Sequence, residues 1–156
     1  MVWSQRTKCP PLPEKFNWSE AQDYRRDSAF VVDCLIWLDR APLYSNIACR
    51  SSVTAYVLEW LSGCPSPVLV VDSRVFPFAE QHPELFLDFL CSMALNQIRY
   101  PSKTDKVAIH SKAFADVAKH LEKEKELKKT SEMKKIIRLG LNEKKLNKYI
   151  RGIVGG

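Results

Sequence analysis

Apolar side chains recur every three or four residues along most of this chain, and this spacing limits its possible folds more than any other feature. Phe30, Cys34, Trp37 and Ala41, for example, follow one another at intervals of four, three and four residues. Residues at these intervals lie on one face of an α-helix and can be buried together. The sequence therefore predicts a mainly α-helical protein, organised as a single compact domain of five to six helices.

Capping residues, prolines and glycines set the expected limits of these helices. Ser19 followed by Gln22 resembles a capping box at the start of the first helix. Pro42 ends that helix, and Pro83 suits the first turn of the third helix, where no backbone N–H is needed. The predicted helices cover residues 19–41, 45–62, 83–98 and about 104–121, and two short amphipathic helices follow on either side of Gly140.

The third predicted helix is apolar around much of its circumference. Leu85, Phe86, Phe89, Leu90 and Met93 together cover more than one face of a helical projection. A helix of this kind packs against neighbours on several sides. We therefore expect residues 83–98 to lie at the centre of the domain and Leu90 to belong to its core.

One short segment has the composition of a β-strand. Val68–Val71 is apolar and rich in β-branched residues, and it is followed by Asp72. The rest of the chain offers no second strand to pair with it. The prediction is therefore at most one short strand in an otherwise helical fold.

Prolines and charges divide the chain into three parts. Residues 1–16, with three prolines, are predicted to form an irregular arm. Residues 17–121 form the predicted helical core domain, and residues 122–156 form a basic helical extension. Residues 103–156 contain 15 Lys and Arg against 7 Asp and Glu, a net charge of +8, whereas the preceding residues carry a net charge of −2.

This local excess of positive charge predicts an acidic partner. Tyr149 and Ile150 belong to an apolar stripe that is expected to dock on the domain or on a partner helix. The basic residues predicted to make contact are Lys128, Lys129, Lys134, Lys135, Arg138, Lys144, Lys145, Lys148 and Arg151.

Two kinds of partner fit this pattern. The leading interpretation is a non-catalytic interaction module that binds a partner protein through apolar and basic helix surfaces. The alternative is RNA or DNA bound by the basic C-terminal third, because basic helices can lie across phosphates. A second copy of the same chain is a further candidate partner, which would give a homo-oligomer. The chain lacks an apolar run of the length that crosses a membrane, so we expect no membrane insertion.

Asp72 is the one candidate for catalysis, and it defines a second alternative. A carboxylate directly after a strand resembles the opening of metal-dependent hydrolase or nuclease sites, which need further carboxylates such as Asp88 or Asp116. Asp72 can instead cap a turn or pair with Arg74. No nucleophile, nucleotide or histidine metal motif accompanies it. The sequence therefore favours a protein without enzyme activity, with the hydrolase or nuclease kept as the second alternative, and we assign no catalytic, metal or cofactor residue.

The cysteine pattern predicts reduced thiols. Five cysteines are widely separated, and their odd number without a secretion signal indicates an intracellular protein, cytoplasmic or nuclear. These residues are Cys9, Cys34, Cys49, Cys64 and Cys91.

Overall fold

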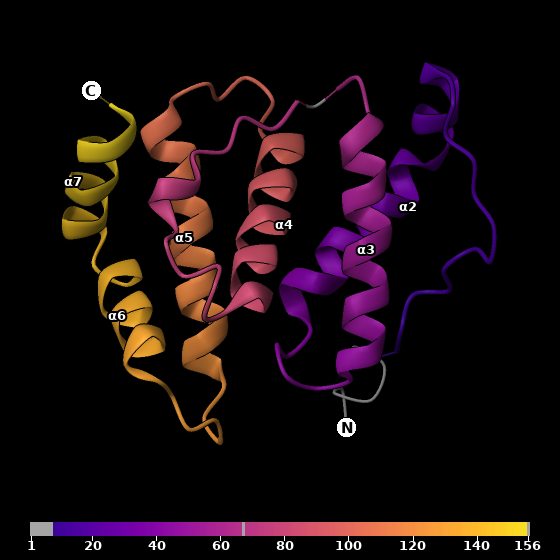
Figure 1. Cartoon of the computed structure of the whole chain (residues 1–156). Helices are drawn as coiled ribbons and strands as arrows, with labels where there is room; N and C mark the ends of the chain where they lie inside the picture. Colours follow the sequence, from indigo (N-terminus) through magenta and orange to yellow (C-terminus); the bar gives the residue numbers. More distant parts are fainter. Residues whose placement is uncertain (1–7, 67, 156) are drawn as a thin grey trace.

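Within residues 8–66 and 68–155, six α-helices and one 3₁₀ turn account for the regular structure (Figure 1). The computed structural model describes residues 8–66 and 68–155, and no strand occurs within them. The mainly α-helical fold predicted from the sequence is confirmed. The elements are α2 (Ala21–Arg40), α3 (Ile47–Gly63), η1 (Ser73–Val75), α4 (Pro83–Arg99), α5 (Lys106–Lys123), α6 (Ser131–Gly140) and α7 (Glu143–Val154).

The helices begin close to the predicted positions, with different caps in places. The N-cap of α2 is Glu20, which forms a reciprocal capping box with Asp23, so the expected Ser19 cap is wrong by one residue. Pro83 occupies the first turn of α4 as predicted. α5 begins after Asp105, whose carboxylate accepts hydrogen bonds from two backbone N–H groups of the first turn.

Helix α4 lies at the centre of the fold, between α2 and α3 on one side and α5 on the other (Figure 1). Phe89 and Met93 are buried in a cluster shared with α5, α6 and α7. Cys91 and Leu95 are buried in a second cluster shared with α2 and α3. The apolar circumference of this helix thus joins two cores. Leu90 is only half-buried, so it is not the core residue that its position in the pattern predicted.

The C-terminal helices α6 and α7 pack against the rest of the fold. α6 and α7 follow each other along the outer side of α5 (Figure 1). Their apolar faces are buried in the same cluster as Phe114 and Val117 of α5. At Gly140, an added Cβ would lie 2.3 Å from the Cβ of Ala118, so only glycine permits this close packing of α6 on α5. Of the two docking places open to this apolar stripe, the domain or a partner helix, the structure shows the domain.

The strand predicted at Val68–Val71 is not formed. Val68 and Val70 are 70% and 66% exposed, and Val71 packs partly against the core. A lone extended segment gains no ladder hydrogen bonds, since no other described segment is extended beside it. Residues 68–72 therefore cross the surface as an irregular connection from α3 to η1.

A disulfide joins Cys9 to Cys49, so the prediction of five reduced thiols is wrong for this pair. Their Cα atoms are 5.9 Å apart, a separation typical of disulfides. The bond attaches the N-terminal arm to α3, where Phe16 and Trp18 stack on each other and contact Tyr56. Residues 8–16, the described part of the arm, thus pack against the hydrophobic cluster shared with α2 and α3. The remaining thiols, Cys34, Cys64 and Cys91, are free.

Thiol counting should find three reactive cysteines in the unreduced, urea-unfolded protein and five after reduction, because one pair is bonded. The measurement is a titration with a thiol reagent under air-exposed preparation conditions. A Cys64→Ser variant should lower both counts by one. Five reactive thiols before reduction would show that the arm is held by packing alone.

Candidate functional site

Seven of the nine basic residues predicted to bind a partner lie on exposed sides of α6 and α7. Both helices are capped at their starts: the Thr130 hydroxyl accepts from the backbone N–H of Met133, and the Asn142 side chain accepts from that of Lys145. These caps fix the two helices, which are short and would be marginal without tertiary packing.

Each of the two helices turns its basic residues away from its buried face. In α6, Lys134, Lys135 and Arg138 are exposed, whereas Met133 and Ile136 are buried. In α7, Lys144, Lys148 and Arg151 share one exposed side, because residues three and four apart are neighbours on a helix. We call the exposed set the basic face: Lys134, Lys135, Arg138, Lys144, Lys145, Lys148 and Arg151.

The basic face is not neutralised by the protein itself. Within residues 8–66 and 68–155, none of its members forms an ion pair. Lys and Arg side chains of one sign on adjacent exposed helices raise the local potential and attract acidic molecules. This face is therefore an exposed concentration of positive charge, without an ion-pair partner among the described residues.

The other predicted contact residues lie elsewhere. Lys128 is exposed, and Lys129 donates from Nζ to the carbonyl of Glu124 at 2.7 Å, which holds the α5–α6 turn. Tyr149 is half-buried and donates from its hydroxyl to the Val75 carbonyl at 3.2 Å. Ile150 is fully buried in the core, so it is removed from the candidate contact surface.

Asp72 sits in a local turn. Its carboxylate accepts from the backbone N–H of Arg74 at 3.1 Å and from Arg74 Nε at 2.9 Å. The hydrogen bonds and charge of Arg74 lower the pKa of Asp72 to about 2. Asp88 and Asp116, the other carboxylates considered for a metal centre, pair with other residues. Asp72 thus plays the capping and pairing role that the sequence offered as an alternative to catalysis.

The histidines connect elements. His110 accepts at Nε2 from the backbone N–H of Asp72 (3.1 Å), and its Nδ1 lies 2.7 Å from the Lys106 carbonyl. Because a carbonyl only accepts, this arrangement requires the proton of His110 on Nδ1. His82 lies 3.0 Å from the Thr130 hydroxyl and so links the starts of α4 and α6.

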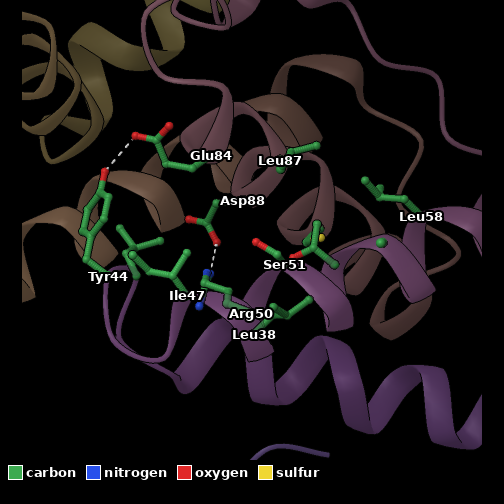
Figure 2. Close-up of a pocket in the computed structure, with 13 residues that line it drawn as sticks. Leu38, Tyr44, Ile47, Arg50, Ser51, Leu58, Glu84, Leu87 and Asp88 are labelled. Atoms are coloured by element: carbon green, nitrogen blue, oxygen red, sulfur yellow. Dashed lines mark hydrogen bonds and ion pairs between the residues drawn. The ribbon is translucent and has the colours of Figure 1, made fainter. Parts of the chain in front are cut away.

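A largely apolar cavity of about 470 Å³ lies between α3 and α4 (Figure 2). Leu38, Leu58 and Leu87 supply apolar walls, and Arg50 and Asp88 face each other inside it. On another side, the Tyr44 hydroxyl donates to Glu84 at 3.0 Å. The volume of this cavity falls in the range of small-molecule sites.

Arg50 and Asp88 belong to a charged quartet that sequence reasoning missed. Arg50 Nη2 donates to Asp88 Oδ1 at 2.9 Å, and His120 Nδ1 lies 2.7 Å from Asp88 Oδ2. His120 Nε2 lies 3.0 Å from Asp39 Oδ1. Burial alone lowers the pKa of His120, but hydrogen bonds from its ring to Asp39 and Asp88 outweigh burial and raise the pKa to about 9. With both ring nitrogens of His120 protonated, the quartet holds two positive charges and two negative charges, so its net charge is zero.

The quartet and the cavity support binding and packing more than chemistry. Both oxygens of Asp88 are occupied by its partners. Cys91 lines the cavity, but burial raises the pKa of its thiol to about 12, so the thiolate that would be a nucleophile is scarce at neutral pH. The cavity therefore offers no activated nucleophile among its described lining residues.

Comparison of the chain with protein-family models, curated protein sequences and solved structures gives no match. Over residues 8–66 and 68–155, no helix is both long and apolar enough to cross a bilayer.

Proposed function

We propose that this protein is a non-catalytic helical binding module whose basic face contacts the phosphate backbone of RNA or DNA. The observation that carries this proposal is the exposure of seven basic side chains on two consecutive capped helices, none of them paired with a carboxylate of the described chain. Phosphate contacts by Lys and Arg supply most of the affinity of sequence-independent nucleic-acid binding.

The packing of α6 and α7 changes the ranking of the two partner classes. The sequence favours a protein partner because it places an apolar stripe beside the lysines. Leu146 and Ile150 of that stripe are buried against α5, so the surface that remains is mainly electrostatic. An extended acidic molecule matches such a surface better than an apolar protein patch does.

A partner protein with an acidic surface is the second candidate. Leu141 stays 43% exposed between α6 and α7, within reach of an incoming apolar side chain. A single exposed leucine amid lysines can anchor an acidic protein, although hot spots are more often aromatic or arginine.

An intracellular location, in the cytoplasm or the nucleus, belongs to this proposal because the proposed partner is nucleic acid. Persistent disulfides are instead typical of oxidising compartments. The thiol count described above therefore bears on the location as well as on the N-terminal arm.

Replacing Lys144, Lys148 and Arg151 by glutamine in one triple variant should weaken nucleic-acid binding by about 10- to 100-fold at low salt. The log–log salt slope should become shallower by about 2 to 3, because each lost phosphate contact removes roughly 0.7–0.9. Fluorescence anisotropy with labelled single- and double-stranded oligonucleotides at about 50 and 200 mM salt measures both quantities.

The matched control removes the same charge from exposed residues of the N-terminal half: Lys15→Gln, Arg25→Gln and Arg40→Gln. This variant should keep most of the affinity, since its residues lie outside the basic face. If both triple variants bind nucleic acid equally weakly, the affinity depends on the net charge of the protein and not on the basic face. An unmodified protein that binds neither RNA nor DNA at low salt, but captures an acidic protein through Leu141, would favour the second candidate.

A further inference from the structure

A second groove, of about 560 Å³, lies beside the basic face. It is formed by the C-terminal end of α4, by α5 and by the turn between α6 and α7. Asn147 of α7 lines it, and Lys144 and Arg151 are three and four residues away from Asn147 on the same helix. The groove therefore continues from the basic face. We call it the α4–α7 groove.

The rim of the α4–α7 groove carries a half-exposed aromatic ring. Tyr100, the residue after α4, is 50% exposed, and Lys103 Nζ lies 4.8 Å from the centre of its ring. The backbone N–H of Tyr100 donates to the Asn96 carbonyl and so caps α4. The side chain of Tyr100 takes no part in this cap. Nucleic-acid bases stack on exposed aromatic rings, and Tyr100 offers such a ring.

The charge of the α4–α7 groove suits a polyanion. Three lysines line it, Lys103, Lys112 and Lys119, against the single carboxylate of Glu143. Lys112 is paired with Asp116 at 2.6 Å, which leaves Lys103 and Lys119 without an ion pair among the described residues. Two cationic side chains thus remain available at its edge.

The lining also contains polar groups with unused hydrogen-bonding capacity. The Ser111 hydroxyl is buried and has no partner within the described residues. Gln97 donates from its amide nitrogen to the Lys103 carbonyl, which leaves its amide oxygen as an acceptor. Amide side chains read the edges of unpaired bases by hydrogen bonding.

We infer that the α4–α7 groove holds one unstacked base of a single-stranded nucleic acid while the basic face holds the adjoining phosphates. This inference rests on the proposed function and narrows its ligand from nucleic acids in general to single strands. A duplex keeps its bases stacked and cannot place one in this groove without the cost of unpairing. Tyr100 supplies the stacking surface, and the lysines at the rim hold the backbone.

The test compares a labelled 12-nucleotide strand with its duplex, each titrated with the full chain and with Tyr100→Ala. Loss of one base–aromatic stack should weaken single-strand binding about 5- to 150-fold and leave duplex binding unchanged. Tyr100→Phe should keep near-normal affinity because it keeps the ring. Ile47→Ala, which truncates an exposed apolar side chain on α3, should have no effect on either ligand.

The outcomes separate this inference from the proposed function. Single-strand binding that is insensitive to Tyr100→Ala but is lost in the Lys144, Lys148 and Arg151 variant would overturn the groove and keep the basic face. Equal weakening of single strand and duplex by Tyr100→Ala would also overturn the groove, since stacking in it is specific to unpaired bases. A full chain that binds neither ligand at about 50 mM salt would overturn both.

Discussion

Replacing Asp88 with asparagine should lower the free energy of unfolding by about 3–5 kcal/mol, the usual cost of removing one partner of a buried ion pair. The side chain of Asp88 is 2% exposed and receives hydrogen bonds from Arg50 and His120. Asparagine replaces one carboxylate oxygen with an NH₂ group. That group is a donor, and it would face the donor of Arg50 or His120. Arg50 would then lose its carboxylate partner, and His120 would keep only that of Asp39. Urea unfolding followed by circular dichroism measures the change.

The control for this prediction is the same substitution at an exposed ion pair. Asp72 also accepts from an arginine, but Arg74 is largely exposed, and water can replace the lost interactions. Asp72→Asn should therefore leave the urea midpoint close to that of the unmodified protein. Similar midpoints for the two variants would contradict the view that burial makes the quartet sensitive.

The quartet also explains how the two halves of the protein are held in one arrangement. Asp39, Arg50, Asp88 and His120 come one each from α2, α3, α4 and α5. The two hydrophobic clusters meet across α4, and apolar packing alone tolerates small shifts between helices. Hydrogen bonds between buried charges do not, because a displaced charge loses its partner. The platform that presents the basic face is thus fixed relative to α2 and α3.

Helix positions could be predicted from the sequence because their signals are local. The period of Phe30, Cys34 and Trp37, the proline at position 83 and the cap at Asn142 each depend on residues within two turns. The strand allowed at Val68–Val71 is not formed, also because its signal is local. β-branched composition is a local signal, whereas a strand forms only when a second segment pairs with it.

The candidate site was only partly predictable. Lysines spaced along α6 and α7 identified the basic face, since exposed charge is visible in sequence. Ile150 was misplaced because an apolar stripe is equally suited to a partner and to the chain's own α5. The quartet and the Cys9–Cys49 bond join residues that are tens of positions apart, with no spacing rule that selects them. The aspartates and histidine of the quartet resemble ordinary helical polar residues until the fold brings them together.

The stability of this protein should fall by about 1.5 kcal/mol between pH 6.5 and 8, out of about 3 kcal/mol that the raised pKa of His120 contributes in full at lower pH. The folded-state pKa is about 9, against an ordinary value of 6.5 in the unfolded chain. A raised pKa means that the folded state binds the proton more tightly. The contribution is therefore complete below pH 6.5 and is lost as the pH rises through 9.

Asp39 acts with the opposite sign at the acid end, because the hydrogen bond from His120 lowers the pKa of its carboxyl. Its contribution is present above the unfolded pKa of about 4 and is lost as the pH falls below that value. Since both groups report one shared interaction, their contributions are not added. Stability should consequently be greatest between about pH 4 and 6.5, the interval in which both charges are present in the folded and unfolded states.

Urea unfolding at half-unit steps from pH 5 to 8 measures this dependence, and the imidazole resonances of His120 in NMR spectra give its folded-state pKa directly. Stopping at pH 8 keeps the free thiols of the unfolded chain mostly protonated, so their ionisation adds little. The burial that raises the pKa of Cys91 would otherwise produce a fall of the same sign above pH 8.5. A flat stability profile with His120 titrating near its ordinary value would show that Asp39 and Asp88 do not hold a protonated imidazole between them. The rigid link between α2, α4 and α5 would then have to come from apolar packing alone.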